Sequence, residues 1–129
     1  MSETRNALIK HNGQPAVPPV EGPVSAPAAD VLEEHDGYVL MLDMPGVLRE
    51  EISVAVAEGT LAVKAPLARP RGGEGRIIHR EIIRGGYERY FSLGEGIDRE
   101  GIDARYENGV LTVRLRKSEA VKPKQITIR

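Results

Sequence analysis

The fold of this chain is decided by one stretch, residues 106–117, which reads Tyr106-Glu107-Asn108-Gly109-Val110-Leu111-Thr112-Val113-Arg114-Leu115-Arg116-Lys117. Asn-Gly adopts positive φ at both central positions of a tight turn more readily than other pairs, so Asn108-Gly109 predicts the corner of a two-residue hairpin. After the corner, apolar residues alternate with polar ones, which is the period of a half-buried strand. Residues 102–106 alternate in the same way before it. The stretch therefore predicts a β-hairpin with one face in a core and the other in water.

The composition limits the class of protein. A chain of 129 residues with 40% hydrophobic residues has room for one domain with one core, and the absence of Trp leaves that core to Val, Ile, Leu and Ala. The net charge of -1 argues against the basic field that nucleic-acid binding uses. The absence of Cys excludes disulfides and thiolate metal sites and fits a reducing compartment. No apolar run approaches the ~20 residues of a membrane span, so we expect a cytoplasmic protein with no membrane or nucleic-acid partner.

The local composition and residue pattern divide the chain into three parts. Residues 1–29 are rich in Pro and Ala, which predicts a flexible N-terminal arm. Residues 30–118 carry the strand-like patterns and are expected to form the domain. Residues 119–129 form a polar C-terminal extension that ends in Gln125-Ile126-Thr127-Ile128-Arg129.

Short strand patterns fill the domain. We expect strands at residues 38–44, 51–57, 61–65, 76–83, 87–93, 102–106 and 111–116, with Pro45-Gly46 and Glu58-Gly59 as turns and residues 66–75 as a loop. Seven or eight strands at these spacings, with no convincing helix, predict an all-β, immunoglobulin-like antiparallel β-sandwich.

The sequence gives little support for a metal site, a phosphate-binding site or a catalytic site. His11, His35 and His79 lack the spacing of a metal site, so no metal or cofactor is expected. The glycines of residues 72–75 lack the Gly-Lys-Ser/Thr of a phosphate loop. The arginines between residues 69 and 84 alternate with Glu and lack aromatic neighbours, which favours a solvated or inter-subunit face over nucleic acid. No serine lies in a nucleophile-elbow context, so an enzyme is the least favoured class.

Four segments together resemble the small heat shock proteins, whose conserved unit is the α-crystallin domain. They are Asp43-Met44-Pro45-Gly46-Val47 followed by Glu51-Ile52-Ser53-Val54, then Tyr87-Glu88-Arg89-Tyr90-Phe91-Ser92-Leu93, then Asn108-Gly109-Val110-Leu111-Thr112-Val113, and finally Ile126-Thr127-Ile128. The resemblance covers residues 30–117 and the tail. It implies an ATP-independent holdase that binds partly unfolded client proteins and prevents their aggregation.

The resemblance also implies how the chain assembles. In bacterial and plant relatives a strand on a long loop, here within residues 69–83, is exchanged between two subunits of a dimer. The implied dimer-interface residues are Arg76, Ile77, Ile78, His79, Arg80, Glu81 and Arg89. The terminal Ile126 and Ile128 would dock into a neighbour's groove between two edge strands, and the implied groove residues are Ile52, Val54, Val56, Ile102, Ala104 and Tyr106.

Three alternatives stay open. Arg89 is either an interface residue that pairs with a carboxylate or an ordinary solvated arginine on a strand. Residues 1–29 contain no aromatic residue, whereas relatives carry a Phe- and Trp-rich arm, so a related partner subunit in a hetero-oligomer is a second possible partner. A client-specific co-chaperone or adaptor on a related sandwich is the alternative function, but that class has no reason to carry Ile126-Thr127-Ile128.

Overall fold

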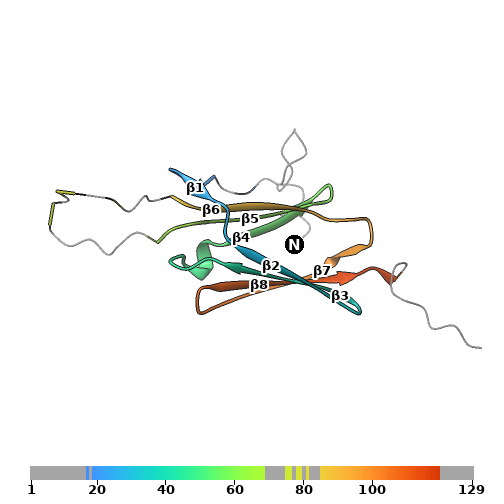
Figure 1. The fold of residues 1–129 in the computed structure, drawn as a ribbon. Coiled ribbons are helices and arrows are strands. Elements are labelled where there is room, and N and C mark those ends of the chain that lie inside the picture. The colour runs from blue at the N-terminus through green and yellow to red at the C-terminus, as the bar shows by residue number, and fades with distance from the viewer. Residues whose placement is uncertain are drawn as a thin grey trace, which may run out of the picture.

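A computed structural model describes residues 17, 19–68, 75, 76, 78, 79, 81 and 85–119 of the chain. These residues form a sandwich of two four-stranded sheets (Figure 1). The first sheet has the order β1-β6-β5-β4, and the second has the order β2-β3-β8-β7. The strands are β1 (Val24–Ser25), β2 (Ala29–Glu34), β3 (Gly37–Asp43), β4 (Ser53–Ala57), β5 (Thr60–Pro66), β6 (Gly86–Ser92), β7 (Ile97–Glu107) and β8 (Val110–Lys117).

The two hairpins that the sequence predicted are present. Asn108 and Gly109 have φ of 52° and 78°, and Glu58 and Gly59 have φ of 48° and 80°. Positive φ at both central positions is the geometry whose twist matches that of the flanking strands. The first corner joins β7 to β8 and the second joins β4 to β5, and both pairs are antiparallel.

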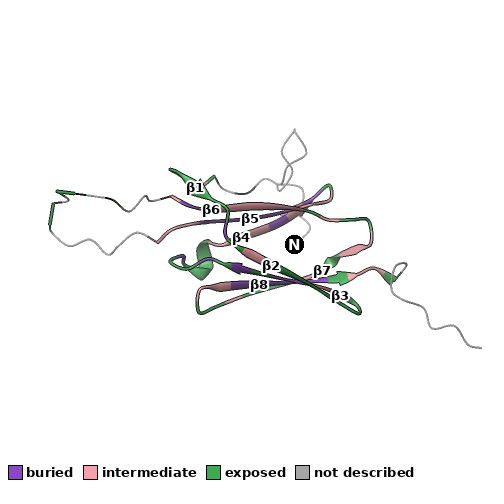
Figure 2. Cartoon of the chain, viewed as in Figure 1, coloured by how far each residue is buried: buried purple, intermediate pink, exposed green. Residues whose placement is uncertain are grey.

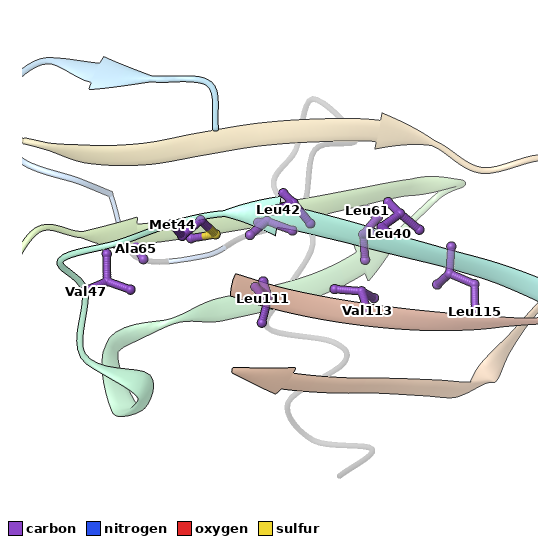
Figure 3. Close-up of a cluster of buried hydrophobic side chains, with 10 residues drawn as sticks. Leu40, Leu42, Met44, Val47, Leu61, Ala65, Leu111, Val113 and Leu115 are labelled. Carbon is purple, nitrogen blue, oxygen red and sulfur yellow. The ribbon is translucent and has the colours of Figure 1, made fainter. Parts of the chain in front are cut away.

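The core lies between the two sheets and is aliphatic (Figure 3). Alternate residues of β3, β5 and β8 point into it, and the largest fully buried side chains are Leu42, Met44, Leu61, Val63 and Val113. Each such side chain contributes roughly 1.5 to 3 kcal/mol when it leaves water. The all-β sandwich is therefore confirmed. Its core consists of Leu, Val and Ala with Met44, and the isoleucines Ile52, Ile97 and Ile102 only pack against it.

Two strands are absent from the sequence-based prediction. β2 pairs with β3 along its whole length, yet its residues Ala-Asp-Val-Leu-Glu-Glu do not alternate cleanly. β1 is only two residues long and lies inside the segment that the sequence assigns to the N-terminal arm. Half of the predicted strand at residues 76–83 lies outside the described residues, and the described Arg76, Ile78, His79 and Glu81 are not in a strand.

Helical structure in the described residues consists of one 3-10 turn and the single residue Glu119. A 3-10 turn at Arg49–Glu51 precedes β4, so β4 begins two residues later than the sequence pattern predicts. Among the residues with described structure, no helix is long and apolar enough to cross a bilayer.

Candidate functional site

The edge strands β4 and β7 lie at the same side of the sandwich, and a groove runs between them. β4 ends the first sheet and β7 ends the second, so each strand pairs on one side only. The groove has a volume of about 570 Å³. We call it the docking groove, and its lining residues are Arg49, Ile52, Val54, Ala104, Arg105, Tyr106, Glu107 and Leu111.

The docking groove combines an apolar wall with a charged rim. Ile52, just before β4, and Val54 of β4 form this wall, and Leu111, which is 2% exposed, belongs to both the groove and the core. Arg49, Arg105 and Glu107 supply the charges. The lining therefore suits a short apolar segment that has polar residues on its other side.

Two tyrosine hydroxyls fix the end of the groove nearest the β3 to β4 connection. Tyr106 of β7 donates to the Met44 carbonyl at 2.7 Å, and Tyr87 of β6 donates to the Pro45 carbonyl at 2.9 Å. Arg49 Nη2 donates to the Tyr106 carbonyl at 3.2 Å. One tyrosine from each sheet thus binds adjacent carbonyls, which ties the sheets together and holds the Tyr106 ring in place.

The Tyr87 hydroxyl stays protonated over a wide pH range. Burial raises the pKa of Tyr87 above its ordinary value, and the nearby Tyr106 raises it further. Because only the protonated phenol donates a hydrogen bond, Tyr87 keeps its bond to Pro45 throughout the neutral range.

The structure brings four of the six predicted groove residues into one cleft. Ile52, Val54, Ala104 and Tyr106 line it, whereas Val56 and Ile102 do not; Val56 and Ile102 are partly buried and pack against the core, as Ile52, Val54 and Tyr106 also do. The β7 to β8 register is irregular between Asp98 and Asp103, so the alternation of β7 does not continue unchanged to Ile102. The docking role of all six residues stays a prediction.

The other predicted interface residues are only partly described. Ile77, Arg80, Ile126 and Ile128 lie outside the described residues. Ile78 is 86% exposed, and His79 lies 3.8 Å from Glu81 as an exposed pair. The structure contains one chain, so the interface role of these residues also stays a prediction.

Arg89 makes contacts within the chain. Its Nη1 donates to the Pro27 carbonyl at 2.8 Å, and its guanidinium lies 5.0 Å from the Phe91 ring centroid. Pro27 belongs to the connection between β1 and β2, where the chain crosses from one sheet to the other. Arg89 therefore holds this crossing in place, and it is not a freely solvated arginine.

A second cleft, of about 550 Å³, lies at the opposite edge of the sandwich. Its lining includes the apolar residues Val31, Leu40, Phe91, Leu93, Ile97 and Leu115. The sequence analysis did not predict it, because Val31 belongs to the unpredicted strand β2, and Leu93 and Ile97 belong to or border the connection between β6 and β7.

Three polar residues of the second cleft, Glu33, Tyr38 and Lys117, form a cluster. Lys117 Nζ lies 2.9 Å from a Glu33 carboxylate oxygen and 5.2 Å from the Tyr38 ring centroid. The hydrogen bond from Lys117, followed by its charge, lowers the pKa of Glu33. The same hydrogen bond is the main reason that the pKa of Lys117 is raised. Both groups are therefore charged at neutral pH.

Clusters of metal ligands were also sought. In the part of the chain that the structure describes, no three His, Cys, Asp or Glu side chains gather where they could hold a metal ion.

Comparison with known proteins places the chain in a family. Residues 30–129 match the Hsp20/alpha crystallin family, and the chain belongs to this family, the small heat shock proteins. It is 34% identical over 107 residues to Spore protein SP21 of Stigmatella aurantiaca, which covers 82% of this chain and 63% of that protein. The chain therefore spans under two thirds of the length of this relative.

Solved structures agree with the fold. Heat shock protein 16.0 from Schizosaccharomyces pombe superposes with a TM-score of 0.63 at 30% identity, over 81% of this chain and 99% of that chain. A small heat-shock protein from Xylella fastidiosa, described as having a distinct high order structure, gives a TM-score of 0.62 at 28% identity, over 83% and 99% of the two chains. The sequence-based assignment to the bacterial type of small heat shock protein is therefore confirmed.

Proposed function

We propose that this protein is an ATP-independent chaperone of the cytoplasm, a holdase that binds partly unfolded proteins and keeps them from aggregating. The observation that carries the proposal is the docking groove, which has an apolar wall and a charged rim and is left open between two edge strands of a family member. An open groove on every subunit lets subunits link through a terminal segment while each link remains reversible. Such assemblies bind clients without an enzymatic step or a cofactor.

The C-terminal extension is the proposed occupant of the docking groove on a neighbouring subunit. In an extended segment residues two apart point the same way, so Ile126 and Ile128 form an apolar pair with Thr127 on the other side. Ile52 and Val54 repeat at the same spacing along the groove wall. Two buried isoleucines contribute roughly 1.5 to 3 kcal/mol each before the cost of ordering the tail, so a single tail binds weakly. Many tails in one closed assembly bind by avidity.

Strand exchange is the proposed basis of the dimer. β2 is an edge strand whose outer side has no described partner strand, and its Val31 and Leu32 are 59% and 48% exposed. β2 is also acidic, because it carries Asp30, Glu33 and Glu34. The stretch of residues 76–83 is rich in Ile and basic residues, so its charge complements this edge. Glu33 and Glu34 already contact Lys117 and Arg114, which leaves Asp30 as the most available acidic residue.

Size and activity measured together test the proposal. We expect multi-angle light scattering after size-exclusion chromatography to show dimers or larger particles. The same preparation, without nucleotide, should suppress the heat-induced light scattering of a model client. A monomer or lone dimer that protects no client would overturn the holdase proposal and favour an adaptor, or a subunit that needs a related partner subunit.

A further inference from the structure

The outer faces of the two sheets differ in burial. We define the outer face of the first sheet as the side that points away from the second sheet, and its residues on β4 and β5 include Ala55, Ala57, Ala62 and Lys64. Their exposed fractions are 3%, 5%, 0% and 5%. On the outer face of the second sheet, Val39 is also buried, at 7%, whereas Leu32 and Met41 are 48% and 40% exposed. The middle of the first sheet's outer face is therefore the less accessible of the two.

The segment that leads into β1 lies on this face. Figure 1 shows the blue chain before β1 running along the side of β6 that is turned away from the second sheet. Val17 is 6% exposed although it lies outside the core cluster. A Cβ added to Gly86 would lie 2.8 Å from Val20 Cγ1, and a Cβ on Gly85 would overlap the Pro23 carbonyl. Gly85-Gly86 therefore lies where the chain before β1 approaches β6 closely, and we call the described residues 17 and 19–25 the cover segment.

The face beneath the cover segment is small and apolar, with its charges neutralised. Lys64 Nζ lies 3.8 Å from a Glu88 carboxylate oxygen and 5.5 Å from the Tyr90 ring centroid. The Tyr90 hydroxyl donates to the other Glu88 oxygen at 3.0 Å. Because these polar groups satisfy one another, the alanines beside them form a surface that an extended apolar chain can lie on without leaving a charge unpaired.

The cover segment is held weakly. β1 pairs with β6 over two residues only, Val24 opposite Gly86 and Ser25 opposite Tyr87. Pro19 and Pro23 have no backbone N–H to add to the pairing, and Val24 is 45% exposed. Local opening is cheap where few hydrogen bonds and few buried contacts hold a segment. Release of the cover segment would free both the alanine surface and the backbone edge of β6.

We propose that the outer face of the first sheet is a polypeptide-binding surface that the chain's own cover segment occupies in the free protein, and that an extended apolar segment of an unfolded client replaces it. This inference rests on the proposed holdase function for the identity of the client. The cover segment itself indicates which kind of client segment would bind, because it is an extended run of Val and Pro that adds a short strand to β6.

Thiol labelling of the full chain tests the cover. The chain has no Cys, so Ala62→Cys introduces a unique thiol, and Ser92→Cys provides an exposed reference on β6. We expect Cys at position 62 to react at least about ten-fold more slowly than Cys at position 92, and to react about ten-fold faster once Val17→Asp and Val20→Asp weaken the cover. Equal rates at the two positions, or no change with the aspartates, would overturn the cover.

Three matched sets of substitutions serve as controls for this labelling experiment. Leu32→Asp with Met41→Asp adds the same charges to the outer face of the second sheet and should leave labelling at position 62 unchanged. Ala65→Cys lies in the core, 0% exposed, and should stay protected if Val17→Asp and Val20→Asp leave the domain folded. If Cys at position 65 becomes reactive, the milder pair Val17→Ser and Val20→Ser is used in place of the two aspartate substitutions. Unchanged labelling at position 62 in that milder variant would overturn the proposal.

Crosslinking tests the client. A benzophenone attached at Ser92→Cys on the first sheet, or at Met41→Cys on the second, is illuminated with reduced, carboxymethylated α-lactalbumin, a permanently unfolded chain. We expect crosslinks mainly from position 92, with a yield that rises about ten-fold when the cover is weakened, because more of the protein is then competent to bind. Equal yields from both faces, in a protein that still suppresses aggregation, would overturn this inference alone. A protein that suppresses no aggregation would overturn the holdase proposal and the client with it, while the labelling result would still decide the cover.

Discussion

The two open edges of the sandwich enclose clefts of nearly equal volume, about 570 Å³ and about 550 Å³, but they are built differently. The docking groove is made by side chains that alternate along two edge strands. The second cleft is made by strands of both sheets together with the connection between β6 and β7, beside the free backbone edge of β2. Figure 2 shows the contrast between β2, which is mostly exposed, and β5, which is mostly buried.

This difference teaches that one sandwich offers two kinds of contact. In the proposed assembly the docking groove receives only side chains, so each contact is small and exchangeable. The β2 edge offers backbone hydrogen bonds as well as exposed Val31 and Leu32, so a strand added there gains both. We therefore expect the β2 edge to hold the stronger contact and the docking groove to hold the weaker one.

The largest expected effect follows from removing the proposed exchanged strand. Deletion of residues 71–83 should convert dimers to monomers, because β2 then has no strand from a neighbour to pair with. Sedimentation velocity measures the mass. A control replaces the same residues by a Gly-Ser linker of equal length and should also give monomers. Dimers that survive both changes would show that the β2 edge is not the dimer contact.

A smaller effect is expected at the docking groove. Ile126→Ala with Ile128→Ala should reduce the mass of the assembly to that of the dimer while the domain stays folded, because the tail loses both buried side chains. Light scattering measures the mass, and circular dichroism checks the fold. Thr127→Ala is the matched control, since this side chain points the other way and should leave the size unchanged. An unchanged mass in the double variant would contradict docking.

Two leucines of β8 each line a cleft at one edge of the sandwich and also belong to the core. Leu111 lines the docking groove and Leu115 lines the second cleft, and both are core residues at 2% and 4% exposure. Replacing either by Ala should lower the free energy of unfolding by about 2 to 5 kcal/mol through the cavity it leaves. Urea unfolding measures this, with Leu32→Ala as an exposed control. A loss at Leu111 but none at Leu115 would show that the second cleft is not part of the packed interior.

The smallest effect is expected from the ion pair at the second cleft. Lys117 lowers the pKa of Glu33, so the pair stabilises the fold above the ordinary carboxyl pKa and loses this as the pH falls through the lowered value. The raised pKa of Lys117 means that stability is present below the ordinary lysine pKa and is lost as the pH rises through the raised one. Glu33→Gln should remove both the acid and the alkaline loss of stability. The midpoints of urea unfolding, measured from acid to alkaline pH, test this. The same pH dependence in wild type and variant would exclude the pair as its source.

Local signals predicted the parts of the fold that local chemistry builds. Asn108-Gly109 and Glu58-Gly59 fixed two hairpins, because positive φ is a property of the turn residues themselves. β2 could not be predicted, because Asp30 and the adjacent Val31 and Leu32 break the alternation, and its strand conformation comes from pairing with β3.

The candidate site shows the same limit. Alternation identified which side chains of β4 and β7 share a face, so Ile52, Val54, Ala104 and Tyr106 meet in one groove. It could not tell how far two edge strands from different sheets stay apart, and Val56 and Ile102 consequently fall outside the groove. The second cleft and the buried Ala62 depend on contacts between segments distant in sequence, which no pattern in one strand reveals.

The position of β8 has a consequence for how this protein is made. β8 pairs with both β3 and β7 in the middle of the second sheet, and it is the last strand in the part of the chain that the structure describes. During synthesis, β2 and β3 leave the ribosome long before β8 exists, so their apolar face has no β8 to pair with while β4, β5 and β6 of the first sheet are translated. Folding that depends on such distant pairing is slow. A protein that is proposed to prevent the aggregation of other proteins is thus itself exposed to aggregation during its own synthesis. This exposure ends when β8 pairs with β3 and β7.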